Sequence, residues 1–143
     1  MVRGARGATR RIAQRCSCST RRAGVGACLQ TACPDVLIQA HSASMGMIFY
    51  DGDQFPPEYG GDVFAAQHGS WNRGKRTGYK VIRARLKDGV PTGEYEDFMT
   101  GFVVNDSSVW ARPVGVAVAH DGALLVSDDG NGTMWRVSYR GGP

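Results

Sequence analysis

The sequence predicts an all-β fold built from successive blades of a β-propeller. An apolar run that ends in polar residues and a glycine occurs at 63–69 and again, 61 residues later, at 124–130. The apolar runs that precede them, 45–49 and 114–118, are 69 residues apart, so the two spacings differ by eight residues. The extra residues fall in one loop, 51–61. Insertions confined to loops are typical of stacked β-units, because each unit keeps its own strands.

The local signals after Pro34 are those of strands and tight turns. Segments rich in valine, isoleucine and aromatic residues alternate with Asp-Gly and Asn-Gly pairs, at which glycine tolerates a positive φ. A sustained 3.6-residue apolar period is not found, and Pro56 and Pro57 mark a loop. We expect strands at 45–50, 62–67, 79–86, 95–104, 113–119, 123–128 and 133–139. The first four make one blade and the last three most of another, about one and two-thirds blades.

A further apolar run follows each unit of the repeat, at 79–83 in the first blade and at 133–137 in the second. The basic side chains of this region are expected to be solvated: Lys75, Arg76, Arg83, Arg85 and Lys87.

Composition divides the chain at about Pro34. Residues 1–33 hold seven arginines, all four cysteines and no acidic residue, whereas residues 34–143 carry 10 basic and 13 acidic side chains. We expect 1–33 to be an unordered, non-homologous segment or a wrongly chosen start, and 34–143 to be the propeller segment. A transit peptide, a secretory signal, a nucleic-acid-binding arm and a metal site are alternatives for the first segment. No run of 18 apolar residues predicts a transmembrane helix.

Strand direction places polar residues of both blades on one face. The first strand of a blade leaves this face and the second returns to it, so the residues at these two junctions converge. His41 and 68–73 of the first blade therefore share a face with Arg112 and 128–129 of the second. Each of these residues has a structural alternative as a turn or capping residue. His120 lies in a hairpin at the opposite end and is expected to be structural.

Several segments resemble the C-terminal part of the glucose/sorbosone dehydrogenases, most closely the L-sorbosone dehydrogenase-like proteins. The resemblance covers about residues 35–140 and none of 1–33. The segments that carry it are Gln39-Ala40-His41-Ser42-Ala43, Phe55-Pro56, His68-Gly69-Ser70-Trp71-Asn72-Arg73, Gly78-Tyr79-Lys80-Val81, 112–118 and 121–129.

The resemblance implies a six-bladed β-propeller that binds pyrroloquinoline quinone (PQQ), commonly with Ca²⁺, at the mouth of its channel. Such enzymes oxidise sugars or sugar aldehydes, passing hydride to the quinone while a histidine accepts a proton. Guanidinium groups suit the carboxylates of PQQ, and Trp71 suits stacking on its rings. No catalytic residue or metal ligand is assigned, because the general-base histidine is expected in upstream blades absent from this chain. The expected cofactor-binding residues are His41, His68, Trp71, Asn72, Arg73, Arg112, Asp128 and Asp129.

The expected function is therefore that of a segment of a PQQ-dependent sugar or aldose dehydrogenase, without full activity of its own. In the complete protein the partners are a sugar or sugar-aldehyde substrate and an electron acceptor, and the location is periplasmic or secreted. The alternative is a non-catalytic propeller segment that acts as a binding or assembly module. A basic-tailed nucleic-acid binder is the third hypothesis.

Overall fold

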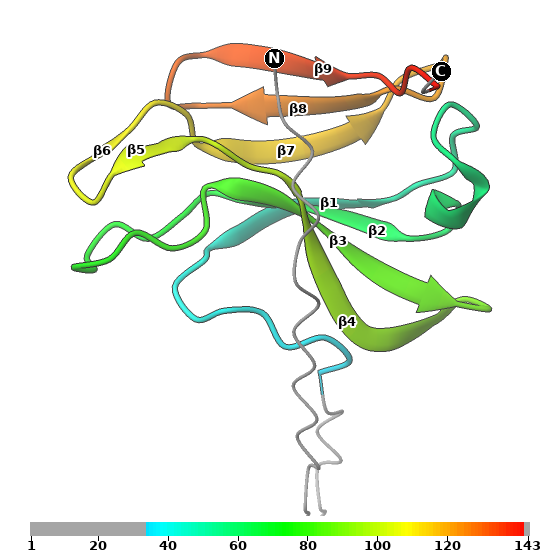
Figure 1. Cartoon of the computed structure of the whole chain (residues 1–143), viewed down its shortest axis with the longest axis horizontal. Helices are drawn as coiled ribbons and strands as arrows, with labels where there is room; N and C mark the ends of the chain where they lie inside the picture. Colours follow the sequence, from blue (N-terminus) through cyan, green and yellow to red (C-terminus); the bar gives the residue numbers. More distant parts are fainter. Residues whose placement is uncertain (1–33, 142–143) are drawn as a thin grey trace, which may run out of the picture.

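The computed structural model describes residues 34–141, and these form three antiparallel β-sheets and one short 3₁₀ helix. The first sheet has four strands in chain order, which fan across the lower half of Figure 1. They are β1 (Ser44–Phe49), β2 (Val63–Gln67), β3 (Lys80–Lys87) and β4 (Val90–Met99). The 3₁₀ helix η1 (Pro57–Tyr59) lies in the loop between β1 and β2.

The second large sheet also follows chain order and lies above the first in Figure 1. It consists of β7 (Pro113–Val118), β8 (Leu124–Asp128) and β9 (Thr133–Val137). Between the two sheets the chain makes a small ribbon of β5 (Val103–Asn105) and β6 (Ser108–Val109). Sheets in which sequence neighbours are spatial neighbours are typical of propeller blades.

The innermost strands of the two sheets, β1 and β7, lie against each other at two glycines. A Cβ atom added to Gly46 would lie 2.9 Å from the Cα atom of Gly115, which is too close for a side chain. Gly46 and Gly115 are equivalent positions of the repeat. The absence of side chains lets the two backbones approach closely, as is needed where blades converge on a common axis.

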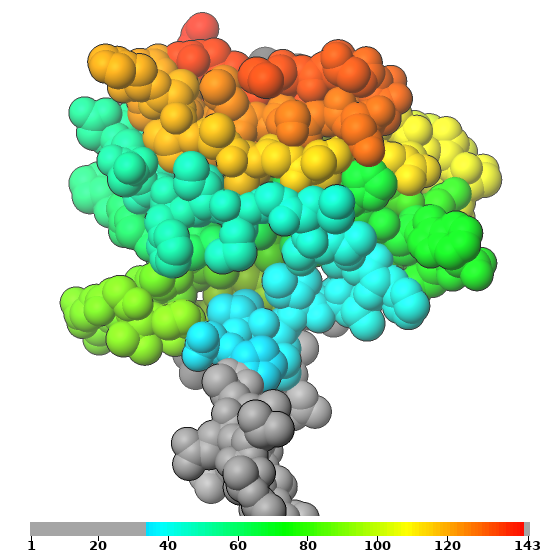
Figure 2. All heavy atoms as spheres, turned by 180° about the vertical axis from the view of Figure 1, so that it is seen from behind, coloured from blue at the N-terminus to red at the C-terminus, as the bar shows by residue number. Residues whose placement is uncertain are grey.

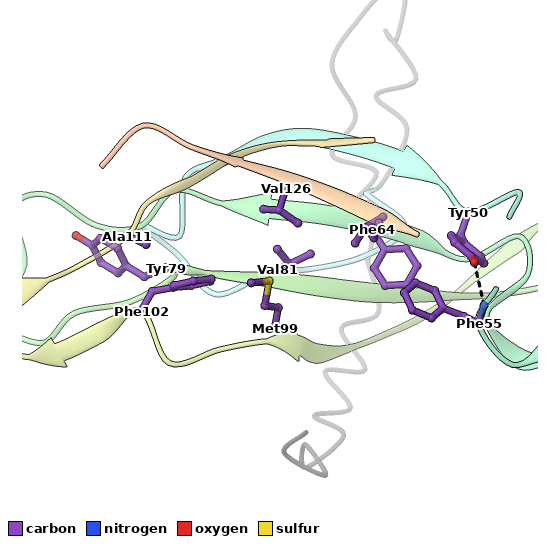
Figure 3. Close-up of a cluster of buried hydrophobic side chains, with 10 residues drawn as sticks. Tyr50, Phe55, Phe64, Tyr79, Val81, Met99, Phe102, Ala111 and Val126 are labelled. Atoms are coloured by element: carbon purple, nitrogen blue, oxygen red, sulfur yellow. Dashed lines mark hydrogen bonds between the residues drawn. The ribbon is translucent and has the colours of Figure 1, made fainter. Parts of the chain in front are cut away.

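The main core fills the wedge between the two sheets (Figure 3). Phe64 of β2 and Val81 of β3 face Val126 of β8, and Met99 of β4 closes the same space. An apolar side chain of this size contributes roughly 1.5–3 kcal/mol when it is fully buried. The packing of the two sheets thus depends on one shared cluster: Tyr50, Phe55, Phe64, Tyr79, Val81, Met99, Phe102, Ala111, Leu124 and Val126.

The all-β class and the two adjacent propeller-type sheets are confirmed, but the fourth strand differs from the expected 95–104. It begins at Val90 because Asp88 and Gly89 make a tight turn, with φ values of 52° and 77°. It ends before Gly101, whose φ of 106° interrupts the ladder, and the chain then starts the ribbon at Val103.

The ladders fix which residues of the two third strands correspond. Phe64 pairs with Arg83, and its repeat equivalent Leu125 pairs with Arg136. Arg83 therefore corresponds to Arg136. Hydrogen bonding to the neighbouring strand fixes this register.

The expectation that Arg83 is solvated is wrong, because its side chain is only 5% exposed. Its Nε donates to Oδ2 of Asp62 at 2.5 Å, and its Nη1 donates to Oε1 of Glu96 at 2.9 Å. The guanidinium lies 3.7 Å from the centre of the Tyr59 ring. The loop between β1 and β2 thus covers a charge that strand periodicity alone assigns to solvent. Lys75, Arg85 and Lys87 are exposed as expected.

The expectations for residues 1–33 lie outside the described residues, which begin at Pro34, where the composition changes. Within residues 34–141, no helix has the length and apolar character needed to cross a membrane.

Candidate functional site

One end of each large sheet lies on the same side of the molecule, on the left in Figure 1. β1 and β7 begin at this end, and β2 and β8 end there. We call it the mouth. His120 lies in the β7–β8 hairpin at the opposite end. All eight residues expected to form a site are at or next to these strand ends: His41, His68, Trp71, Asn72, Arg73, Arg112, Asp128 and Asp129.

His68 and Asp129 connect the two sheets directly. The Nε2 atom of His68 lies 3.0 Å from Oδ1 and 3.1 Å from Oδ2 of Asp129. The two residues are equivalent positions of the repeat, so each blade contributes the same position to this bridge. Because an ionised carboxylate can only accept, Nε2 is the donor in this contact.

Asp128 is buried and its oxygens are used within the second sheet. Oδ1 accepts the backbone N–H of Arg112 at 2.7 Å and that of Gly130 at 2.8 Å. Oδ2 accepts from Thr133 Oγ1 and Trp135 Nε1. Burial acts to raise the pKa of Asp128, but these hydrogen bonds outweigh it and hold the pKa below its ordinary value of 3.8. The carboxylate therefore braces the turn that positions Asp129.

Two arginines bring positive charge to the mouth from different blades. The guanidinium of Arg112 lies 5.8 Å from the centre of the Tyr79 ring, within cation–π range. Arg73 is exposed, and its Nη1 donates to the carbonyl oxygen of Ala40 at 3.1 Å. Arg73 is thereby held beside His41, the residue that follows Ala40.

The other three expected site residues face solvent. Trp71 is 86% exposed, and Asn72 next to it is exposed as well. His41 is exposed and has a φ of 66°, a conformation typical of turns. The structure thus brings His68 into contact with Asp129, whereas His41, Trp71 and Asn72 are exposed in the loops before β1 and after β2.

The long loop between β2 and β3 is anchored by Tyr79, a residue expected only to begin a strand. Its Oη donates to the carbonyl oxygen of Ser70 and accepts from Nη1 of Arg76 at 3.2 Å. The ring lies under Gly69, where an added Cβ would come within 2.5 Å of it. Tyr79 has a φ of 54°, and strand periodicity does not predict a positive φ. The adjacent Gly78 is the one local sequence feature that indicates a turn at this position.

A cleft of about 470 Å³ opens between this loop and the β4–β5 connection. Its lining is rich in cationic side chains, from Arg73, Lys75, Arg76 and Lys80. Lys80 is neutralised by Asp97, with Nζ 2.5 Å from Oδ1. Within the described residues, no group of three or more His, Cys, Asp or Glu side chains is arranged to hold a metal ion.

Comparison with known proteins finds one family model and relatives in sequence. A family model described as TrAA12-like matches residues 12–140. A pyrroloquinoline quinone-dependent pyranose dehydrogenase from Coprinopsis cinerea is 29% identical over 128 residues, which cover 77% of this chain and 17% of that protein. An uncharacterised protein from Borreliella burgdorferi is 39% identical over 103 residues, covering 71% of this chain and 27% of that protein.

Two solved structures share the fold. The holo form of the PQQ domain of pyranose dehydrogenase from Coprinopsis cinerea has a TM-score of 0.59 at 26% identity and covers 74% of this chain and 29% of its own. A calcium structure of the Trichoderma reesei family AA12 enzyme has a TM-score of 0.57 at 21% identity, with 71% and 25% covered. The chain spans less than a third of the length of each of these relatives.

Proposed function

This chain belongs to the TrAA12-like family, and from that membership we propose that residues 34–141 supply part of the cofactor-binding mouth of a PQQ-dependent sugar dehydrogenase. The observation that carries the proposal is the contact between His68 and Asp129, which joins two blades at the end where Arg73 and Arg112 also lie. The similarity to a PQQ-dependent pyranose dehydrogenase supports a sugar or sugar aldehyde as the substrate class.

The residues present fit a flat, polycarboxylate cofactor. Arg112 and Arg73 present guanidinium groups, which bind carboxylates through two parallel hydrogen bonds. The exposed indole of Trp71 is available to cover a planar ring system, and Asn72 offers an amide donor. When bound, PQQ supplies the acceptor for the hydride that leaves the sugar. Ca²⁺, if used, draws on ligands beyond the described residues, because these show no cluster for it.

His68 has a defined chemical task in this proposal. Asp129 accepts a hydrogen bond from Nε2, which orients the imidazole ring and leaves Nδ1 facing away from this contact. Nδ1 can then accept a hydrogen bond or a proton at the mouth. The chain by itself is proposed to bind the cofactor without sustained turnover, since it spans only 17% of the pyranose dehydrogenase.

Equilibrium dialysis of PQQ against the purified chain tests the proposal. We expect saturable binding that weakens roughly tenfold to a hundredfold in Arg112→Ala and Arg73→Ala, because each loses a charge-assisted hydrogen bond of about 1.5–3 kcal/mol. His120→Ala is the matched control, since His120 is exposed at the opposite end.

Two results would contradict the proposal. Wild-type chain that does not retain PQQ would show that the mouth is not a site in this segment. Equal weakening by His120→Ala and the arginine variants would show that the assignment of the site to this end by strand direction is wrong.

A further inference from the structure

The loop between β2 and β3 carries three of the expected site residues on a short excursion that is closed at its base. The backbone N–H of Ser70 donates to the carbonyl oxygen of Thr77 at 2.8 Å, and the N–H of Thr77 donates to Oγ of Ser70 at 3.1 Å. Residues 71–76 lie between them, and we call these the mouth loop. Its side chains Trp71 and Arg73 are exposed, so the position of the mouth loop depends on what holds its base.

The hydroxyl group of Tyr79 is the buried anchor of that base. Tyr79 is 1% exposed, and its Oη donates to the carbonyl oxygen of Ser70. Oη also accepts from Nη1 of Arg76 at 3.2 Å, so one hydroxyl group holds both ends of the mouth loop. Arg76 reaches on to the β5–β6 ribbon, where its Nε donates to the carbonyl oxygen of Asp106 at 2.9 Å. In Figure 2 the green mouth loop accordingly lies directly below the yellow ribbon.

The ring of the same tyrosine contacts a site residue of the other blade. The guanidinium of Arg112 lies 5.8 Å from the centre of the ring, within cation–π range. The ring itself lies at one end of the core cluster, beside Phe102 and Ala111 (Figure 3), so packing fixes its position. Tyr79 thus holds the mouth loop of the first blade through its hydroxyl group and supports Arg112 of the second through its ring.

The backbone of Tyr79 is in a conformation that its surroundings have to impose. A φ of 54° is rare for an aromatic residue, and such outliers are concentrated at binding sites. The preceding Gly78 has a φ of 83°, and a Cβ atom added to it would lie 2.7 Å from the Cα atom of Gly69. This close approach of two backbone segments brings the tyrosine ring against the residue that follows His68.

We propose that Tyr79 is the positioning residue of the mouth, which keeps Trp71 and Arg73 of one blade in a fixed relation to Arg112 of the other. The inference rests on the proposed function, because a cofactor that contacts both blades binds more tightly when its partners are already in place. Arg76 belongs to this arrangement and not to the cofactor-binding set, because its guanidinium is occupied by Tyr79 and by backbone carbonyl oxygens.

Trypsin digestion of the full chain tests the hold on the mouth loop in the absence of any cofactor. Cleavage after Arg73 requires the loop to open, so its rate follows the open population. Tyr79→Phe keeps the ring and removes both hydrogen bonds of Oη, and we expect cleavage after Arg73 to be roughly threefold to thirtyfold faster. Cleavage after Lys87, at the β3–β4 turn, should keep its wild-type rate. Tyr139→Phe is the matched control, because Tyr139 is 47% exposed and follows the end of β9 that lies away from the mouth.

Arg76→Met tests the same hold without a change in the core. Arg76 is only partly buried, and the variant removes its hydrogen bonds to Oη of Tyr79 and to the ribbon. We expect faster cleavage after Arg73 here as well. Combined with Tyr79→Phe, it should accelerate cleavage by less than the product of the two single effects, because residues that act as a unit are not additive.

Equilibrium dialysis then measures the consequence for PQQ. We expect Tyr79→Phe to bind PQQ roughly threefold to tenfold more weakly than wild type. Saturating PQQ should slow cleavage after Arg73 in this variant, because binding favours the ordered loop. Tyr79→Leu also removes the ring and should bind more weakly than Tyr79→Phe, since Arg112 loses its cation–π contact. Equal binding by the two variants would overturn the part of the proposal that concerns Arg112.

Unchanged cleavage after Arg73 in Tyr79→Phe would overturn the proposal, because the hydroxyl group would then not hold the loop. Equal acceleration after Arg73 and Lys87 would also overturn it, since Tyr79 would then support the whole sheet. An opened loop that binds PQQ as well as wild type does would do the same. Wild-type chain that does not retain PQQ would instead overturn the proposed function, and the trypsin comparison would still decide whether Tyr79 holds the mouth loop.

Discussion

Arg83 and Arg136 occupy the same ladder position in the two sheets, but their surroundings are opposite. Arg83 is 5% exposed and pairs with Asp62 and Glu96 beneath the ring of Tyr59. Arg136 is 49% exposed and pairs with Asp121 at the surface. The first sheet has a fourth strand and an 11-residue loop (51–61) that cover its arginine, whereas the described second sheet has three strands and a three-residue turn.

The difference shows that the neighbouring elements, and not the strand itself, decide how much a charged side chain contributes to the stability of the fold. A buried ion pair loses hydration that only its partners replace, so removal of one member leaves an uncompensated charge. An exposed pair keeps its water and is weakened by salt, so it contributes little to stability. The two blades thus offer the same residue in two environments within one molecule.

The largest effect is expected for Arg83→Ala. It leaves Asp62 buried and unpaired, and we expect the free energy of unfolding to fall by about 3–5 kcal/mol. Urea denaturation followed by circular dichroism measures this loss. The double variant Asp62→Asn with Arg83→Met removes both charges and should recover part of the stability. A double variant no more stable than Arg83→Ala would show that packing around the guanidinium matters more than the unpaired charge.

A smaller loss is expected for Asp128→Asn. The substitution weakens hydrogen bonds to the backbone N–H groups of Arg112 and Gly130, and bonds to a charged acceptor are worth about 1.5–3 kcal/mol. We expect a decrease of about 1–3 kcal/mol in the free energy of unfolding at neutral pH. A decrease below the error of urea denaturation would mean that the turn holds its shape without the carboxylate.

The pH dependence of that difference follows from the lowered pKa of Asp128. A carboxyl with a lowered pKa stabilises the folded state fully above its unfolded value of about 3.9, and this contribution disappears as the pH falls through the folded value. Wild type and Asp128→Asn should therefore differ above about pH 4 and converge in stronger acid. A difference that stays constant down to low pH would assign the effect to shape instead of charge.

The smallest effect is expected for Asp121→Asn, which removes the partner of Arg136. Both side chains of this pair are half exposed, and hydrogen bonding and Arg136 lower the pKa of Asp121 only against an opposing desolvation effect. We expect no measurable change in the free energy of unfolding at moderate salt. A loss comparable to that of Asp128→Asn would show that the two arginines are not in different environments.

Much of the fold follows from local sequence patterns. The repeat located both large sheets, and Asp-Gly and Asn-Gly pairs located their hairpins, because these signals act within a few residues. The burial of Arg83 could not be predicted, since it depends on Tyr59 and Glu96 from other elements. The ribbon at Val103 was missed for a similar reason: a glycine with positive φ, Gly101, ends one strand without a change in composition.

The sequence predicted that the candidate site residues lie at one end of the two sheets, but not which of them contact each other. Strand direction placed His68 and Asp129 at one end, and the structure joins them. The four hydrogen bonds that Asp128 accepts could not be predicted from the sequence. Their donors come from residue 112 and from the turn and strand that follow Asp128. The cofactor roles of the eight mouth residues stay a prediction.

The three tryptophans of the chain lie in two different environments, which fluorescence can distinguish. Trp110 and Trp135 form an edge-to-face pair, with ring centres 5.3 Å apart, beside Phe102 of the core. Trp71 stands alone in solvent on the mouth loop. Emission from the pair therefore reports the contact between the end of the ribbon and β9 of the second sheet. Quenching of Trp71 by a small solute or an absorbing ligand reports events at the mouth. Replacing Trp71 with Phe leaves a fluorophore that follows unfolding only.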